Sequence, residues 1–415
     1  MMNGSLGSIR KAGAFMSENK TSVFSNGLLW FGAGISIAEI LTGMLLAPLG
    51  LAKGLLAILI GHVIGGAVMF GAGLIGGRTG KSAMETVAIS FGHQGARLFA
   101  GLNVIQLIGW TAGMIASAAA AANTLSGMGS SVWSVIIGAF IALWIVLGLK
   151  NLGKVNVVVI AALLLLTLVL SGVIFMGDHV PQAVGDMTLG AAIELTVAMP
   201  LSWLPVISDY TRIAEKPFKA TAASCLAYFA ASSWMFIIGM GAALYTGQDD
   251  IAQILLQAGM GLVGILIVLL STVTTTFLDA FSAGVSGKTL ISVYLHLIKH
   301  RTHEKALALI ACAGGIGLAV MMDSSSFEEF LYFIGSVFAP MTAILLSDYF
   351  ILKQDHSEES VDWLNLALWL AGFILYRQLL DVQTPLGITF PVIVLVMLAS
   401  ALVHKAVGAR CVQSR

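Results

Sequence analysis

Long apolar stretches separated by short polar turns run along most of the chain. An α-helix needs roughly 20 apolar residues to cross the hydrocarbon core of a bilayer. The pattern predicts an all-α polytopic membrane protein with one transmembrane domain, 26–407, between an N-terminal tail, 1–25, and a C-terminal tail, 408–415. About twelve stretches are long enough to cross, at 26–48, 52–77, 92–124, 131–149, 154–176, 188–209, 220–246, 257–284, 303–321, 327–352, 363–381 and 385–407.

The basic residues fall almost entirely on one side of the membrane when the N-terminus is placed in the cytoplasm. Only Lys53 and Arg377 then lie on the outside, where the predicted loops instead contain acidic residues such as Asp178, Asp249 and Asp323. Lysine and arginine accumulate in cytoplasmic loops. The distribution therefore predicts an even number of helices with both termini in the cytoplasm of a bacterial-type inner membrane.

The composition agrees with a chain surrounded by lipid. Of its 415 residues, 58% are hydrophobic and 10% are charged, and the mean hydropathy is +0.94. Soluble domains carry about 25% charged residues, so a soluble protein is excluded. The net charge of zero gives no indication of nucleic-acid binding. The three cysteines have no disulfide or metal-binding spacing, and neither a cofactor nor an obligate protein partner is expected.

The first predicted helix, 26–48, is weakened near its middle. It contains FGAGISIAEILTG, in which Gly32 and Gly34 precede Ser36 and Glu39. Glycine disfavours a continuous helix, and an acidic residue deep in a membrane helix is costly and usually functional. Glu39 is therefore a candidate to bind substrate or carry a proton, with a structural hydrogen-bonded role as the alternative.

The sixth predicted helix, 188–209, contains AMPLSWLPVISDYTR, with Pro200 and Pro205 on either side of Ser202 and Trp203. Proline removes a helical hydrogen bond, so the prolines are expected to free backbone groups for a substrate that Ser202 and Trp203 face. Transporters bind substrate where helices are broken at corresponding positions of two inverted repeats. Helices one and six correspond if the repeats are helices 1–5 and 6–10. Both breaks together favour a transporter over simple close packing at glycine and proline.

The eighth predicted helix, 257–284, contains LLSTVTTTFLDAFSAG, in which hydroxyl groups are dense for a lipid-facing surface. Oxygen ligands from Ser271, Thr274 and Thr275 suit a weakly held cation such as Na⁺, together with carbonyl groups from the broken first helix. The alternative is that each threonine bonds its own helix backbone. Asp279 follows Thr275 by one turn and is a second buried acid with the same possible roles as Glu39.

Two further pairs of side chains are singled out by their spacing. Gln106 and Trp110 lie i, i+4 and share a helix face. An indole offers a stacking surface, and an amide offers a donor and an acceptor. The pair could therefore bind a planar heterocycle, and a packed helix core explains it equally well. Asp209 and Arg212, spaced i, i+3, are expected to form a structural or gating ion pair at the cytoplasmic end of helix six.

These features resemble the nucleobase–cation symporter-1 family, which includes cytosine permease, hydantoin transporters and hydroxymethylpyrimidine permeases. The resemblance covers about 23–405. ISIAEILTG with MPLSWLP is most similar to the hydroxymethylpyrimidine branch. The resemblance rests on the order and spacing of GLIGGRTGKSAMETVAISFGHQGARL, IGWTAG, SDYTR, TTTFLDAFSAG and LSDYF.

The resemblance implies a leucine-transporter-like fold, with two inverted five-helix repeats and two C-terminal helices. It also implies transport by alternating access with one coupling cation, Na⁺ or H⁺. It implies a stacking role for Trp110. The cation ligands that it implies are Gly32, Ile35, Ser271, Thr274 and Thr275.

The sequence departs from the family pattern in the substrate site. The glutamine found three residues before the stacking tryptophan in cytosine permease is replaced by Leu107, and Gln106 stands one residue earlier. Pro200 occupies the usual position of the helix-six aromatic residue, so a clamp by Trp203 is our inference. Thr276 replaces an asparagine, which indicates a substrate other than cytosine.

The sequence predicts a symporter that imports a small planar pyrimidine-type heterocycle, hydroxymethylpyrimidine or cytosine. A protonated Glu39 could pair with the amine and ring nitrogen of an aminopyrimidine, so Glu39→Gln is expected to abolish or strongly reduce uptake. An amino-acid symporter on the same fold is the alternative. An intramembrane enzyme would have only Glu39 and Asp279 as a possible catalytic pair, without a suitable histidine, and no catalytic residue is expected.

Overall fold

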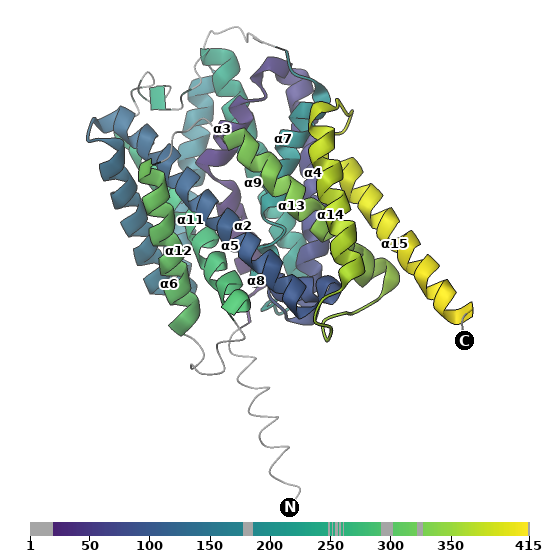
Figure 1. Ribbon diagram of the computed structural model, residues 1–415. Coiled ribbons are helices and arrows are strands. Elements are labelled where there is room, and N and C mark those ends of the chain that lie inside the picture. The colour runs from purple at the N-terminus through teal and green to yellow at the C-terminus, as the bar shows by residue number, and fades with distance from the viewer. Residues whose placement is uncertain are drawn as a thin grey trace, which may run out of the picture.

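The computed structural model describes residues 20–176, 186–247, 250, 252–253, 256, 259, 261–291, 302–321 and 327–413. Within these ranges the chain is helical, and the helices form one bundle (Figure 1). Eleven helices are long and apolar enough to cross a membrane, or up to twelve if one bent pair is counted as a span. The predicted all-α architecture is confirmed. Most of the predicted N-terminal tail, 1–19, and the last two residues of the predicted C-terminal tail, 414–415, lie outside the described residues.

The first membrane crossing is broken, as its sequence predicts. Helix α2, Val23–Gly34, and helix α3, Ile37–Met44, are bent by 48° at the break between them. Ser36 is extended, with φ −133° and ψ 148°, and its hydroxyl accepts a hydrogen bond from the Ala38 amide. Serine at a helix N-cap satisfies an amide that has no partner within the helix. The break is therefore a defined cap, and the short 3₁₀ helix η1, Ala47–Leu49, follows it.

The sixth predicted helix is also interrupted, but later than its first proline suggests. Helix α7, Leu189–Ser202, includes Pro200, and helix α8, Ile207–Thr211, resumes after a turn that contains Pro205. Of the membrane-crossing stretches, Leu189–Thr211 is the most buried, at 94%. The break therefore lies at the centre of the bundle. Helices α4, Leu51–Thr79, and α9, Pro217–Thr246, pack against the two broken helices.

The remaining central helices are long. Helix α5, Ala83–Ser126, is kinked at Gly92, where φ is 69° and ψ is 174°, and the sequence places the start of the third crossing at this residue. Helix α6 runs from Ser130 to Phe175 and contains two apolar windows, Ser130–Leu147 and Val157–Phe175, which overlap the predicted fourth and fifth crossings, 131–149 and 154–176. Helices α11, Gly261–Ile291, and α12, Thr302–Met321, complete this side of the bundle.

The helices from α13 to the C-terminus pack on the other side of the bundle, with α14 and α15 in yellow-green to yellow (Figure 1). Helix α13, Phe327–Leu346, continues as a π-helical turn, η4, Ser347–Leu352. Helices α14, Trp363–Gln378, and α15, Thr389–Gln413, follow, with the 3₁₀ turn η5, Leu379–Asp381, between them. Their apolar windows are only 17% and 22% buried, so these two helices form the periphery and leave most of their surface for lipid.

Candidate functional site

A small cavity lies where the two broken helices meet helices α5 and α11. Its water-accessible volume is about 10 Å³, and a cavity needs roughly 10–15 Å³ by this measure to hold one water molecule. The helices around it must separate before a larger ligand can enter. The cavity is lined by Ala33, Ser36, Ala38, Glu39, Trp110, Met114, Met199, Ser202, Trp203, Thr275 and Asp279.

Seven residues singled out in the sequence meet in this wall, from four separate parts of the chain: Ser36, Glu39, Trp110, Ser202, Trp203, Thr275 and Asp279. Two expected substrate ligands, Gln106 and Thr276, are buried but are not among the residues that line the cavity. The Ser202 hydroxyl donates to the Met199 carbonyl at 2.7 Å, within its own helix. The wall is thus mixed, with aromatic, thioether, hydroxyl and carboxyl groups.

The two tryptophans of the wall are fixed by other aromatic rings. Trp203 packs edge-on against Trp30, with ring centroids 5.3 Å apart and planes at 89°, and Trp110 packs against Phe330 at 5.5 Å. Trp30 is fully buried and also contacts Tyr210 and Tyr228. Edge-to-face pairs of this kind stabilise by about 0.5–1.5 kcal/mol beyond burial. The indole rings are therefore held in place in the cavity wall.

Asp279 is the open carboxylate of the cavity. It is 4% exposed, and no hydrogen bond or ion pair reaches its side chain from the residues that the structure describes. The hydroxyl of Thr275, one turn earlier on α11, is also buried without a partner among them. Buried carboxyl groups without hydrogen bonds are costly. Both groups are consequently available to a polar ligand.

Glu39 is the engaged carboxylate of the cavity. Its Oε1 accepts a hydrogen bond from the Tyr228 hydroxyl at 2.6 Å, and its Oε2 lies 2.8 Å from the Ser232 hydroxyl. The Ser232 hydroxyl also lies 2.6 Å from Nε2 of His62, whose Nδ1 lies 2.9 Å from the Ile58 carbonyl. These contacts tie the broken first helix to α9 and α4.

If Glu39 were ionised and His62 neutral, there would be too few protons to make both contacts of the Ser232 hydroxyl into hydrogen bonds. A carbonyl only accepts, so Nδ1 of His62 carries a proton, and Nε2 of a neutral ring can then only accept. The single proton of Ser232 serves either His62 or Glu39, and the other contact needs a second proton. Beyond the proton on Nδ1 of His62, Glu39 and His62 therefore share one more proton, which lies on the carboxyl group or on Nε2 of the imidazole.

The helix-six break does not present its carbonyl groups to the cavity as expected. The Ser202 carbonyl is 3.4 Å from Nε2 of Gln106, and the Pro205 carbonyl accepts from Nδ2 of Asn103 at 2.9 Å. Asn103 also bonds Gln106 and, on α11, Ser286. Two amide side chains of α5 thus occupy the freed backbone groups, because unpaired carbonyls within a membrane are costly. Gln106 therefore contacts the backbone of the helix-six break in this structure and does not line the cavity.

Comparison with known proteins defines the family. The profile of a family described as permeases for cytosine/purines, uracil, thiamine and allantoin matches residues 16–363. The chain belongs to this permease family. Cytosine permease of Escherichia coli K12 is 23% identical over 325 residues, which cover 76% of this chain and 74% of the relative. The permease is a multi-pass membrane transporter and not an enzyme.

Solved structures show the same fold. The closed conformation of Mhp1, a nucleobase-cation-symport-1 family transporter with bromovinylhydantoin bound, superposes with a TM-score of 0.76 at 18% identity, covering 93% of this chain and 92% of that one. A Na⁺-coupled sialic acid symporter in its substrate-bound outward-open state gives a TM-score of 0.71 at 14% identity, covering 94% and 91%. The predicted leucine-transporter-like fold of the permease is confirmed.

The expected cation ligands occupy the first break and the adjoining face of α11. The Ile35 amide donates to the Gly32 carbonyl at 3.2 Å. The hydroxyls of Ser271 and Thr274 donate to carbonyl groups of their own helix, at 3.3 and 2.8 Å. Such hydroxyls still offer oxygen lone pairs, and the Thr275 hydroxyl is unpaired among the described residues. The donor set therefore fits a hard cation, which prefers oxygen ligands.

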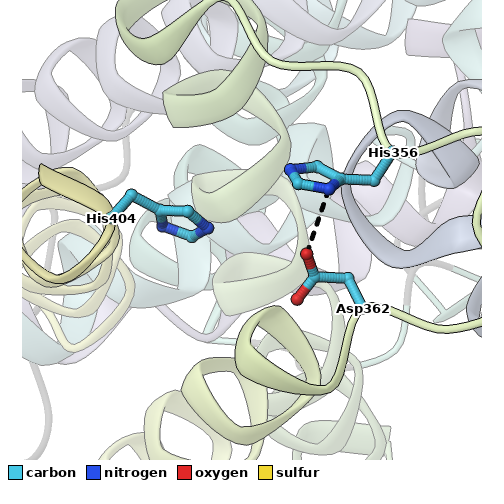
Figure 2. A group of neighbouring side chains, drawn as sticks. All are labelled: His356, Asp362 and His404. Carbon is cyan, nitrogen blue, oxygen red and sulfur yellow. Dashed lines mark ion pairs between the residues drawn. The ribbon is translucent and has the colours of Figure 1, made fainter. Parts of the chain in front are cut away.

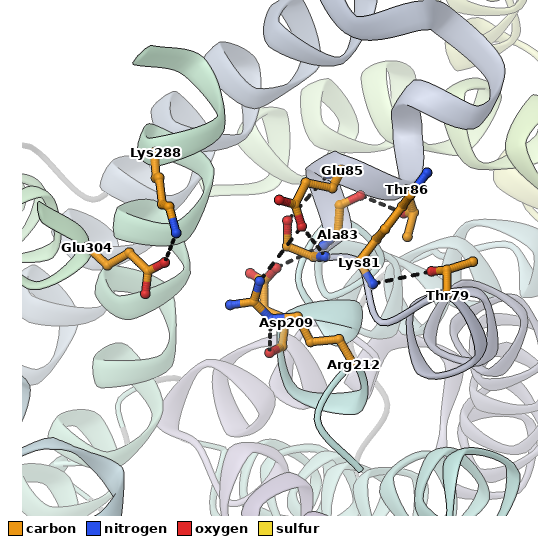
Figure 3. A network of polar contacts seen from close by, with 10 residues as sticks. Thr79, Lys81, Ala83, Glu85, Thr86, Asp209, Arg212, Lys288 and Glu304 are labelled. Carbon is orange, nitrogen blue, oxygen red and sulfur yellow. Dashed lines mark hydrogen bonds and ion pairs between the residues drawn. The ribbon is translucent and has the colours of Figure 1, made fainter. Parts of the chain in front are cut away.

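The expected ion pair between Asp209 and Arg212 takes a different form (Figure 3). Oδ1 of Asp209 accepts from the Ala83 amide at 2.9 Å, at the start of α5, while Arg212 lies 3.8 Å from Glu85 and donates to the Asp209 main-chain carbonyl. Asp209 sits at a helix N-terminus, where negative charge is favoured. Both residues thus join α8 to α5 and close this end of the site.

Several residues of the site were not identified in the sequence. Tyr228, Ser232 and His62 bond Glu39 directly or through one hydroxyl, while Asn103 caps the helix-six break. Tyr228 and Ser232 are spaced i, i+4 in an apolar helix, a polar stripe that marks them as facing the same neighbour. Trp30 gives no comparable signal because a buried tryptophan in a membrane helix is ordinary.

Proposed function

We propose that this permease is a symporter that imports a small planar pyrimidine-type heterocycle together with a cation, by alternating access across the inner membrane with both termini in the cytoplasm. The observation that carries the proposal is the cavity between the two helix breaks, where Trp110, Trp203 and the open carboxylate of Asp279 meet. Hydroxymethylpyrimidine and cytosine, which carry an exocyclic amine beside a ring nitrogen, are the substrates that we place first.

The chemistry of the wall supports such a ligand. Indole rings stack on planar heterocycles, and an exocyclic amine can donate to Asp279, whose carboxyl group has no hydrogen-bond partner among the described residues. Ser36, Ser202 and Thr275 add hydroxyl groups to the same wall. Because the cavity holds about one water molecule as it stands, substrate enters only after the broken helices move away from α5 and α11.

The proposal allows either Na⁺ or H⁺ as the coupling ion, and a different set of residues would bind each one. Na⁺ would bind the carbonyls of Gly32 and Ile35 and the hydroxyls of Ser271, Thr274 and Thr275, thereby linking the first helix to α11. H⁺ would use the proton that Glu39 and His62 share. Removing external Na⁺ separates the two: lost uptake supports the sodium site, and unchanged uptake supports the proton.

The substrate is tested with purified protein in detergent and in proteoliposomes. Hydroxymethylpyrimidine, cytosine, uracil, hydantoins, allantoin and free amino acids are screened by thermal shift, since a ligand that binds the folded state stabilises it by mass action. Uptake of the stabilising compound is then measured for Asp279→Asn and for the control Asp381→Asn, which changes an exposed aspartate.

We expect Asp279→Asn to lose about tenfold or more of its uptake, because a hydrogen bond to a charged group contributes about 1.5–3 kcal/mol and 1.4 kcal/mol is a factor of ten. Asp381→Asn should behave as the wild type. Full uptake by Asp279→Asn would refute the assigned role. Stabilisation by amino acids and by none of the heterocycles would refute the substrate class.

A further inference from the structure

The side chains of two histidines and an aspartate, His356, His404 and Asp362, lie close together (Figure 2). His356 and Asp362 lie in the segment between η4 and α14, and His404 lies on α15. One potential ligand atom from each residue falls within 4.8 Å of the other two, and the two imidazole rings are 6.2 Å apart. All three side chains are at least partly buried.

The hydrogen bonds of the two rings fix which nitrogen carries the proton. Nδ1 of His404 lies 2.9 Å from the Ser400 carbonyl, which can only accept. Nδ1 of His356 lies 2.9 Å from a carboxylate oxygen of Glu359 and 3.2 Å from one of Asp362. Both Nδ1 atoms therefore carry protons, and the Nε2 atom of each ring presents a lone pair when the ring is neutral.

These two Nε2 atoms are buried and have no hydrogen-bond partner among the residues that the structure describes. Leaving a buried polar atom unpaired costs about 1–3 kcal/mol. A metal-binding histidine usually donates a hydrogen bond from one ring nitrogen and binds the metal with the lone pair of the other. A cation that accepts both lone pairs would satisfy these atoms.

The ligands are held on well-anchored backbone. The His356 amide donates to the Ile89 carbonyl at 2.8 Å, and the Asp362 amide donates to the Phe91 carbonyl at 3.3 Å. The amides of His93 and Gln94 donate back to the same segment. These four bonds surround the kink of α5 at Gly92. The segment is thereby fixed to α5, and His404 approaches it from α15.

The donor set selects the class of ion. Two imidazole nitrogens and one carboxylate oxygen suit Zn²⁺ and related first-row metals better than Mg²⁺ or Ca²⁺. Because Zn–N bonds are about 2.0–2.1 Å, ligand atoms of one ion lie roughly 3–4 Å apart, so the three ligand atoms, which fall within 4.8 Å of one another, would move closer to hold one ion.

We propose that His356, Asp362 and His404 form a binding site for a divalent first-row transition metal. Bound metal fastens α15 to the segment before α14 and, through its backbone hydrogen bonds, to the kink of α5. The site is independent of the transported substrate, because none of its three residues lines the transport cavity.

The test uses the tag-free full chain in detergent, stripped with a chelator and titrated with Zn²⁺. Bound zinc per chain, the thermal shift on adding zinc, and the visible absorption of Co²⁺ are measured for the wild type, His404→Gln and Asp362→Asn. Asparagine is also a good N-cap, so Asp362→Asn keeps the cap of α14 that the Asn365 amide uses. His93→Gln, a change at an exposed histidine near the same end of the bundle, is the control.

We expect one zinc ion bound by the wild type and by His93→Gln, each with a thermal shift and a Co²⁺ spectrum of a low-coordinate site. His404→Gln and Asp362→Asn should each weaken binding by about a hundredfold or more, since even outer-shell changes cost 10–100-fold. Zinc binding of equal affinity in all four proteins, or no zinc-dependent shift in the wild type, would overturn the proposal. If His404→Gln fails to fold, the zinc affinity of Asp362→Asn alone tests the proposal.

Discussion

Replacing Glu39 by glutamine should leave the fold almost unchanged, whereas replacing Ser232 by alanine should not. In Glu39→Gln, the amide oxygen accepts from Tyr228 and the amide nitrogen donates to Ser232. Ser232 then donates to Nε2 of His62, whose Nδ1 proton stays on the Ile58 carbonyl. Every contact that the structure shows is kept, because glutamine supplies the proton that Glu39 and His62 otherwise share.

The magnitudes follow from counting buried groups. Glu39→Gln keeps all four contacts and adds one amide N–H that has no partner among them, so the free energy of unfolding should fall by about 1–3 kcal/mol or less. Ser232→Ala leaves Oε2 of Glu39 and Nε2 of His62 without their shared partner. At about 1–3 kcal/mol for each unpaired buried group, the loss should be about 2–6 kcal/mol. Ser233→Ala is the matched control, since the neighbouring hydroxyl has no partner among the described residues.

Thermal unfolding in detergent, followed with a thiol-reactive dye, measures these differences because Cys225 and Cys312 are buried in the folded protein. Uptake is measured in parallel. We expect Glu39→Gln to be folded yet strongly impaired in uptake, because its amide cannot release a proton or become charged. The reasoning would be wrong if Glu39→Gln were destabilised as much as Ser232→Ala, or if Ser232→Ala matched Ser233→Ala.

Three further predictions concern the contacts that hold the broken helices and the C-terminal helices. Glu194→Leu should lower the free energy of unfolding by about 2–6 kcal/mol, because this α7 carboxylate accepts from two backbone amides at the start of α15; an unchanged thermal unfolding curve would contradict this. Asp209→Ala removes the acceptor for the first amide of α5 and should speed alkylation of a cysteine introduced at Ser202, whereas equal labelling rates would argue against closure by this contact. Gly92→Ala should cost about 1–3 kcal/mol, since φ is 69° and an added Cβ would meet the Glu359 carbonyl at 2.7 Å; wild-type stability in the unfolding assay would show that the kink is not required.

The sequence by itself determined the membrane-spanning helices and both helix breaks. Apolar length, glycine, proline and capping serine act within one or two turns of the chain, so they can be interpreted locally. Trp110, Trp203 and Asp279 were predicted as substrate ligands from local patterns: Trp110 lies one turn after Gln106, Trp203 lies between two prolines, and Asp279 is an acid within a membrane helix. The structure places all three in one cavity wall, while their roles remain predictions.

Tertiary structure alone decided which polar groups are already paired. Glu39 and Asp279 look alike in the sequence, yet Glu39 bonds Tyr228, 189 positions further along the chain, and Asp279 has no such partner among the described residues. The freed carbonyls at the helix-six break are likewise taken by amides of α5, and His404 meets His356 only because α15 returns to the segment before α14. Hydrogen-bond partners come from helices far apart in sequence, so no local pattern can assign them.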